Sequence, residues 1–207
     1  MARHRAPVQR RGFARTRAVL AGAVVLGVGA SITLASWTDD EYASGSFAAS
    51  TFNTESSTVA GVWASNTSSP GAALAFNASG MSPSVSYYAW INIRTSAAST
   101  VGGTVQLASS ATSGGLVPVL EYRAVRTAAT STTCDPTAFG GSPTYVAGGS
   151  ASYLAVTAVP GTPVVSNISS PSGELRFCFE TRVQAGATNS YQGTSATVTW
   201  LFAATSS

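Results

Sequence analysis

The chain has 207 residues, of which only 9% are charged, and its formal net charge is +3. This positive charge comes from six arginines that precede residue 18, whereas all eight acidic residues follow Ala35. A chain beginning at Ser36 has five arginines against these eight acids, a formal charge of −3, which excludes the basic surface that nucleic-acid binding needs. The remaining length is enough for one domain that buries roughly 70% of its unfolded surface.

The first 35 residues have the layout of a secretory signal peptide. The six arginines precede an apolar run, residues 19–35, whose only polar members are Ser31 and Thr33. A basic start, a short apolar stretch and small residues before the break are typical of a signal that is removed during export. We predict that a signal peptidase recognises Thr33 and Ala35 and cleaves between Ala35 and Ser36.

Two other interpretations of this segment remain open. A run of about 17 apolar residues is the lower limit for spanning a bilayer, so the segment is also compatible with an uncleaved membrane anchor. The pair Arg10-Arg11 with the nearby Phe13 fits a twin-arginine export signal. We expect a secreted protein of the cell surface or matrix, which contacts the membrane only through an uncleaved signal peptide.

After the signal, alternating apolar and polar residues predict short strands and no further helix. The clearest pattern is in residues 85–94, where Val85, Ala89 and Ile93 fall on one face, and a second lies in residues 196–202. The other predicted strands are 47–53, 59–64, 100–107, 116–126, 153–159 and 175–183.

Glycine and proline turns separate these segments, as in Ser113-Gly114-Gly115 and Pro160-Gly161. Short strands at this spacing predict an all-β fold, an antiparallel two-sheet sandwich of jelly-roll type. We assign residues 54–207 to this sandwich and residues 36–53 to a separate mature N-terminal segment. The apolar faces of the strands are expected to form the core.

The chain has two cysteines, Cys134 and Cys178. In an exported protein such a pair is expected to form a disulfide, which stabilises the fold by roughly 4 kcal/mol in the chain-entropy model. Two free, buried thiols are the alternative.

Few residues are available for catalysis. His4, the only histidine, lies inside the predicted signal, and the chain has no lysine. This excludes a Ser-His-Asp triad, His-based zinc sites and lysine nucleophiles. Paired carboxylates remain available, but nothing in their spacing predicts that two converge. We therefore expect no enzymatic activity and no cofactor.

The acidic residues suggest two smaller features. The run Asp39-Asp40-Glu41 is expected to be a solvated N-terminal segment, with a Ca²⁺ site as the alternative. Glu174, Arg176, Glu180 and Arg182 alternate in sign on one face of a strand, which predicts charge pairing on that face.

Several stretches carry a family resemblance: residues 21–30, 33–39, 43–47 and 51–53 around the signal junction, and residues 176–179 and 191–200 further on. They resemble the SipW-dependent signal peptides and mature sequences of TasA and camelysin-like exported proteins, in an actinobacterial version. Between about residues 55 and 170 only the strand pattern is similar.

This resemblance implies a jelly-roll subunit that assembles with itself, or with other matrix proteins, into extracellular fibres of a biofilm matrix. In such fibres the N-terminal segment of one subunit completes a sheet of the next, and an exposed sheet edge is a physical template for this pairing. The candidate donor is residues 36–53, with Trp37, Phe47 and Phe52 as its aromatic residues.

Two other functions stand beside this one. A surface adhesion or carbohydrate-binding module would use exposed aromatic residues such as Trp63, Tyr88 or Trp90 as a stacking platform. The camelysin branch also implies metallopeptidase activity, which a mature chain without histidine does not support.

Overall fold

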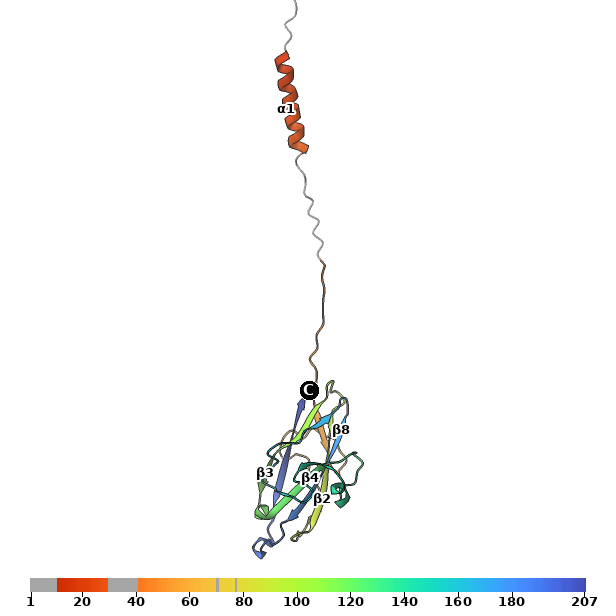
Figure 1. The fold of residues 1–207 in the computed structure, drawn as a ribbon, viewed down its shortest axis with the longest axis vertical. Helices are drawn as coiled ribbons and strands as arrows, with labels where there is room; N and C mark the ends of the chain where they lie inside the picture. The colour runs from red at the N-terminus through yellow and green to blue at the C-terminus, as the bar shows by residue number, and fades with distance from the viewer. Residues whose placement is uncertain (1–10, 30–40, 70, 77) are drawn as a thin grey trace, which may run out of the picture. The chain divides into compact units, whose positions relative to one another are not determined.

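The computed structural model describes residues 11–29, 41–69, 71–76 and 78–207. It divides into two units, Met1–Phe47 and Ala48–Ser207. The first contains one helix, α1 (Arg11–Gly29), which covers much of the predicted signal peptide (Figure 1). No helix among the described residues has the length and apolar character needed to cross a membrane.

The second unit is a sandwich of two antiparallel sheets, as the sequence predicts (Figure 1). The large sheet has six strands in the order β1-β2-β8-β4-β5, with β6 also pairing to β4. β8 lies at its centre, between β2 and β4, and pairs along almost its whole length with β2. The strands are β1 (Thr54–Ser57), β2 (Ser86–Thr95), β4 (Leu120–Arg126), β5 (Thr144–Ala147), β6 (Leu154–Ala155) and β8 (Glu174–Val183).

The small sheet has three strands in the order β7-β3-β9. They are β7 (Ser166–Ile168), β3 (Gly103–Ser113) and β9 (Thr197–Ser206). The chain therefore passes from the large sheet to the small one at β3, returns at β4, and alternates again through β7, β8 and β9. This alternation is what a jelly-roll-like sandwich requires. Short 3-10 helices are η1 (Val117–Val119), η2 (Pro136–Phe139) and η3 (Asn189–Tyr191).

Aromatic side chains from both sheets fill the core between them. Tyr122 and Phe179 of the large sheet are fully buried, and their rings stack with centroids 6.1 Å apart. From the small sheet, Trp200 lies 4.7 Å from Phe179 and Phe202 lies 4.6 Å from Phe177, measured between ring centroids. Such pairs stabilise a core by about 0.5–1.5 kcal/mol beyond the area they bury.

The strands with clear alternation are confirmed, but two predicted strands are wrong. Residues 47–53 form no strand, because no neighbouring strand pairs with them. Residues 59–64 are interrupted by a turn in which Gly61 adopts φ 73° and its N–H donates to the carbonyl of Thr58. The strand comes earlier, at β1, and Ala64 returns to form only an isolated bridge with Ser56.

Three further predicted strands have different bounds. Residues 117–119 form the 3-10 helix η1, whose Pro118 lacks an N–H for a ladder, so β4 begins at Leu120. β3 starts later than predicted, at Gly103, and continues to Ser113. Of residues 153–159, only Leu154 and Ala155 are in a strand.

The disulfide between Cys134 and Cys178 is confirmed, with Cα atoms 5.4 Å apart. Cys178 is fully buried on the outer face of β8, the face that points away from the small sheet. The bridge ties the loop that carries η2 to the centre of the large sheet, where Phe139 of η2 packs against Val125.

Candidate functional site

The longest outer strand of the sandwich, among the described residues, is β9. β9 has 10 residues and pairs with β3 on one side. On its other side no strand pairs with it among the described residues. Because antiparallel strands direct alternate backbone groups to each side, every second residue of β9 presents its N–H and C=O to this edge.

The other outer strands are much shorter. β1 and β5 have 4 residues each, and β7 has 3. Short edge strands, charged side chains and prolines are the usual means by which proteins prevent pairing with other chains. β9 has none of these features, since its sequence Thr197–Ser206 contains neither a charge nor a proline.

Both faces of β9 are free of charge. Val198, Trp200 and Phe202 point into the core, and Leu201 on the opposite face is 56% exposed. The strands β3 and β7 also lack charged residues. The whole small sheet is thus an uncharged surface of hydroxyl, amide and small apolar side chains.

Residues 65–82 cover the core beside β9 without joining the sheet. Leu74, Phe76 and Met81 pack against the core, and the Phe76 ring lies 6.1 Å from that of Trp200. Within the described part of this segment no backbone hydrogen bond to β9 is formed. The described residues of this segment therefore contact β9 through side chains and form no backbone pair with its edge.

The predicted donor segment is divided by the structure. Thr33, Ala35, Ser36 and Trp37 lie outside the described residues. Residues 41–50 have no regular secondary structure, and the side chains of Tyr42 and Phe47 are 94% and 98% exposed. We call residues 36–50 the arm.

Residues 51–53, in contrast, are bound to their own sandwich. The N–H of Thr51 donates to Oγ1 of Thr100 at 2.9 Å, and the N–H of Thr100 donates to the carbonyl of Thr51 at 2.9 Å. The N–H of Asn53 donates to Oγ of Ser99 at 3.0 Å. Phe52 packs against the core, so this aromatic donor candidate is already used within its own domain.

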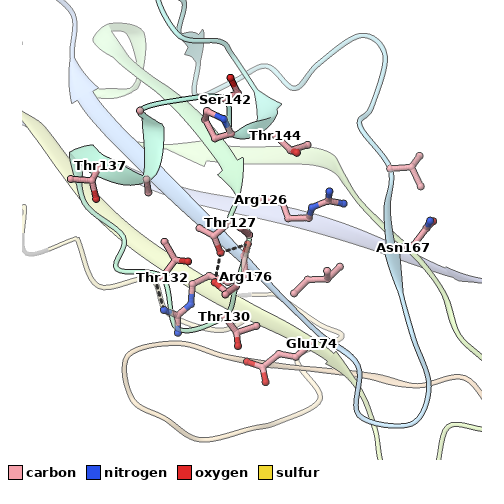
Figure 2. A pocket seen from close by; sticks show the side chains of 17 residues that line it. Arg126, Thr127, Thr130, Thr132, Thr137, Ser142, Thr144, Asn167, Glu174 and Arg176 are labelled. Carbon is pink, nitrogen blue, oxygen red and sulfur yellow. Dashed lines mark hydrogen bonds between the residues drawn. The ribbon is translucent and has the colours of Figure 1, made fainter.

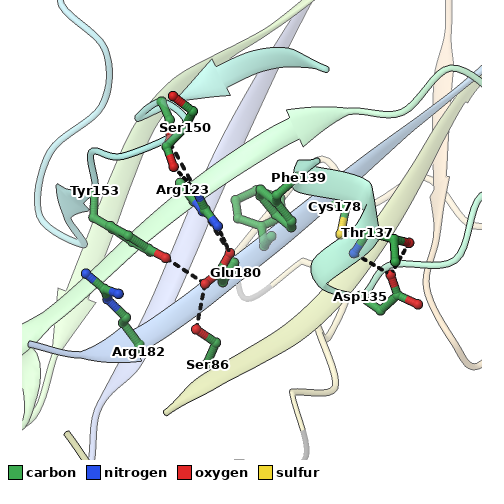
Figure 3. Close-up of polar contacts among 12 residues, drawn as sticks. Ser86, Arg123, Asp135, Thr137, Phe139, Ser150, Tyr153, Cys178, Glu180 and Arg182 are labelled. Atoms are coloured by element: carbon green, nitrogen blue, oxygen red, sulfur yellow. Dashed lines mark hydrogen bonds and ion pairs between the residues drawn. The ribbon is translucent and has the colours of Figure 1, made fainter. Parts of the chain in front are cut away.

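The outer face of the large sheet carries charged residues, whereas the small sheet has none in its three strands. Glu180 of β8 is only 2% exposed and accepts hydrogen bonds from Ser86 Oγ, Tyr153 OH and Arg123 Nε at 2.5, 2.7 and 2.7 Å (Figure 3). Arg182 pairs with Glu121 on the neighbouring strand at 2.7 Å. The predicted charge pairing is therefore confirmed for Glu180, which pairs with Arg123, and for Arg182, which pairs with Glu121. Arg176 and Glu174 instead both bond to the side chain of Asn92.

These contacts set the protonation of the buried groups. Burial alone would raise the pKa of Glu180, but hydrogen bonds from Ser86, Tyr153 and Arg123, together with the charge of Arg123, outweigh burial and lower it. Burial, and then the hydrogen bond and charge of Glu180, raise the pKa of Tyr153 to about 12. The cluster is a satisfied structural ion pair in which Glu180 stays ionised and Tyr153 stays protonated.

The aromatic residues considered as a stacking platform lie on this same face. The guanidinium of Arg94 lies 4.2 Å from the centroid of Trp63, and that of Arg176 lies 4.1 Å from the centroid of Trp90. Tyr88 packs against Phe139, with ring centroids 5.9 Å apart. One face of each tryptophan is therefore occupied by an arginine of the protein itself.

No group of three or more His, Cys, Asp or Glu side chains suited to a metal ion occurs in the described residues. Of the acidic run, Glu41 is exposed, whereas Asp39 and Asp40 lie outside the described residues. Asp135 is used locally, because its carboxylate caps η2 by accepting from the N–H of Thr137 at 2.8 Å (Figure 3).

Sequence reasoning missed the features that distinguish this site. It identified residues 196–202 as a strand but not as the edge of a sheet, since strand order is a property of the folded chain. The partners of Glu180 come from positions 86, 123 and 153, and no local pattern links them.

Neither a protein-family model nor a curated protein sequence matches this chain.

Proposed function

We propose that this chain is an exported, non-enzymatic structural protein of the cell surface or biofilm matrix, related to the TasA and camelysin-like proteins. Its subunits join when the arm of one adds a strand to the free edge of β9 in the next. The observation that carries the proposal is the long, uncharged edge of β9, together with an arm in which Tyr42 and Phe47 are exposed. Added strands gain affinity from main-chain hydrogen bonds and specificity from alternate side chains.

The arm has a composition suited to this role. Residues 43–50 contain only Ala, Ser, Gly and Phe, so they carry no charge that would oppose pairing. In an extended arm Phe47 and Ala49 fall on one face, whereas Ser46 and Ala48 fall on the other. Residues 43–50 therefore offer a face with one large apolar ring to the core side of a sheet and a face of small residues to solvent.

The lengths of arm and edge also match. Ten residues of β9 extend about 34 Å at ~3.4 Å per residue. The arm from position 36 to position 50 spans at most about 50 Å at ~3.3–3.6 Å per residue. The arm is thus longer than β9, so part of it can pair along the edge while the rest connects the two subunits. Because arm and edge are different surfaces, each addition leaves a new arm and a new edge, and the assembly stays open.

Export supports the same proposal. The basic and apolar N-terminal segment has the layout of a signal peptide. A disulfide such as Cys134–Cys178 persists in oxidising compartments outside the cytoplasm. Release of the signal after Ala35 would free the arm, so that assembly begins only after export.

The test uses the chain that begins at Ser36. We expect sedimentation and negative-stain microscopy to detect fibres whose formation depends on concentration, and to find only monomers when residues 36–50 are deleted or Phe47→Asp is introduced. Thr199→Lys with Leu201→Lys places two charges on the edge strand and should block assembly. The matched control, Thr104→Lys with Gln106→Lys, places the same charges on β3 and should assemble more readily than the variant with lysines on β9. A chain that remains monomeric at every concentration would contradict the proposal.

A further inference from the structure

A polar hollow lies on the sandwich away from the β9 edge. Its volume is about 970 Å³, and it is lined by the ends of β4 and β5, by β7, and by residues 127–132 and 174–176 (Figure 2). β7 and β9 flank β3 on opposite sides of the small sheet, so the hollow and the proposed assembly edge are separate surfaces. Its size falls in the range of ligand-binding pockets.

One arginine in this hollow differs from the other four of the sandwich. Arg94, Arg123 and Arg182 each pair with a glutamate, and Arg176 donates to Asn92 and to the carbonyl of Thr132. The side chain of Arg126 makes no hydrogen bond or ion pair with any described residue. Within the described part of the sandwich it is the single guanidinium whose donors are all available.

The position of Arg126 is also unusual for a cation. It pairs in register with Phe177, whose side chain is fully buried in the core, so Arg126 lies on the core-facing side of the large sheet. It is the last residue of β4, where the hollow opens between the two sheets, and Figure 2 shows its side chain extending toward Asn167 of β7. A half-buried guanidinium that has no counter-ion among the described residues is a ready partner for an anion.

The surroundings of Arg126 supply neutral polar groups. Thr130, Ser142, Thr144 and Asn167 line the hollow, and none of their side chains forms a hydrogen bond with a described residue. Glu174 is the one acidic residue of the lining, and its carboxylate already accepts from Asn92 at 2.6 Å. The hollow thus combines one available positive charge with several free hydroxyl and amide groups.

We propose that this hollow binds a saccharide that carries a carboxylate, such as a uronic acid unit of a polysaccharide. The guanidinium of Arg126 matches a carboxylate with two parallel hydrogen bonds, and a single positive charge suits a single negative one. The hydroxyls and the amide of Asn167 are the donors and acceptors that sugar hydroxyls require. Neither Trp63 nor Trp90 contributes, since both lie outside the lining.

The test measures binding of trigalacturonate to the chain beginning at Ser36, by titration calorimetry at low salt. We expect weak binding that decreases as sodium chloride is added, and at least tenfold weaker binding of neutral maltotriose. Arg126→Gln should weaken the binding of trigalacturonate at least tenfold, because it removes the charge and the paired hydrogen bonds to the carboxylate. Arg126→Lys keeps the charge but loses the paired geometry, so its affinity should lie between the two.

Two controls make the result specific. Arg94→Gln removes an arginine of the outer face that does not line the hollow, and it should leave the affinity unchanged. The melting temperature of Arg126→Gln should equal that of the unsubstituted protein, because the guanidinium of Arg126 forms no hydrogen bond with a described residue. Equal affinity for maltotriose, unchanged binding by Arg126→Gln, or sulfate binding as tightly as trigalacturonate would each overturn the proposal. This measurement does not depend on fibre formation, so the saccharide-binding proposal can fail while the assembly proposal succeeds.

Discussion

The outer faces of the two sheets differ in charge and in how their side chains are held. On the large sheet, Glu55, Glu121 and Glu180 each form an ion pair with an arginine on a neighbouring strand, and aromatic rings pack against these arginines. On the small sheet no residue of the three strands is charged. The charged side chains thus lie on the sheet where they form ion pairs, and the uncharged sheet ends in the long free edge of β9.

Under the proposed function, this difference separates two tasks that a matrix subunit has to combine. Charges on both faces would protect the molecule from association, because like charges and desolvation oppose the pairing of edges. Here Glu55, Glu121 and Glu180 of the charged face are paired with arginines of the protein itself, and the uncharged sheet is left able to pair. The following substitutions test this division, in order of their expected effect on stability.

The largest effect is expected for Glu180→Ala. The substitution leaves the guanidinium of Arg123, which is mostly buried, without its carboxylate, and breaking such a pair costs about 3–5 kcal/mol. Urea denaturation monitored by fluorescence measures the change in the free energy of unfolding. The control is Glu180→Leu with Arg123→Met, which removes both charges and should be much less destabilising. Equal losses in the two variants would contradict the role of the pair.

The second-largest loss of stability is expected when Cys134→Ala with Cys178→Ala removes the disulfide. A bridge across 44 residues constrains the unfolded chain, and its loss should cost up to about 4 kcal/mol in the chain-entropy model. We also expect the loop that carries η2 to exchange its amide hydrogens faster, because the bridge ties it to the large sheet. Hydrogen exchange and thermal melting measure the two effects. Unchanged exchange in residues 135–143 would contradict the second.

Acid should weaken the charged face selectively. The folded-state pKa of Glu180 is lowered, so its contribution is fully present above its ordinary value of 4.5 and is lost as the pH falls through the lower folded value. Melting temperatures measured from pH 7 to pH 2 should therefore decline below about pH 4.5. The Glu180→Gln variant should decline less over the same range, and a parallel decline would show that other carboxylates control acid stability.

A smaller effect is expected for Glu55→Gln. Its pair with Arg94 is about one-third exposed, with side-chain exposures of 29% and 31%, so solvent screens it. Exposed pairs contribute about 0.2–1 kcal/mol, and about 1 M salt should remove most of the difference between the variant and the unsubstituted protein. Chemical denaturation at low and high salt measures this change. A loss as large as that of Glu180→Ala would contradict the distinction between exposed and buried pairs.

The smallest effect on stability is expected for Leu201→Lys. The side chain is more than half exposed on the uncharged sheet, and surface substitutions usually change stability by less than about 0.5 kcal/mol. If the small sheet is the surface of assembly, this variant should nonetheless sediment as smaller particles than the unsubstituted protein. Normal assembly of a stable Leu201→Lys chain would weaken the case for β9.

The sequence predicted the fold where a strand is long and half-buried. β2, β8 and β9 alternate over ten residues, so their apolar faces stand out. β5 and β7 have only 4 and 3 residues, too few for a pattern, and their pairing depends on neighbours that are distant in the chain. Residues 47–53 look like a strand because Phe47 and Phe52 flank small residues, yet only Phe52 has a core to enter.

The candidate sites were less predictable. The exposed edge of β9 follows from strand order, and the free guanidinium of Arg126 follows from which acids the other arginines meet, so both are tertiary properties. The disulfide could be predicted, because two cysteines in a chain that begins with a signal-like segment leave one pairing.

The attachment of residues 51–53 to the loop at Ser96–Thr100 has a mechanical consequence. In a fibre joined by arms, tension on an arm would reach its own sandwich first at Thr51 and Asn53. There the backbone N–H groups of Thr51, Asn53, Ser96 and Thr100 and the hydroxyls of Thr51 and Ser99 form hydrogen bonds that share the load. The chain then continues directly into β1, which pairs with β2 through Thr54 to Ser57. A pull along β1 shears these pairs together instead of opening them one at a time, so the joint would resist stretching more than its short length suggests.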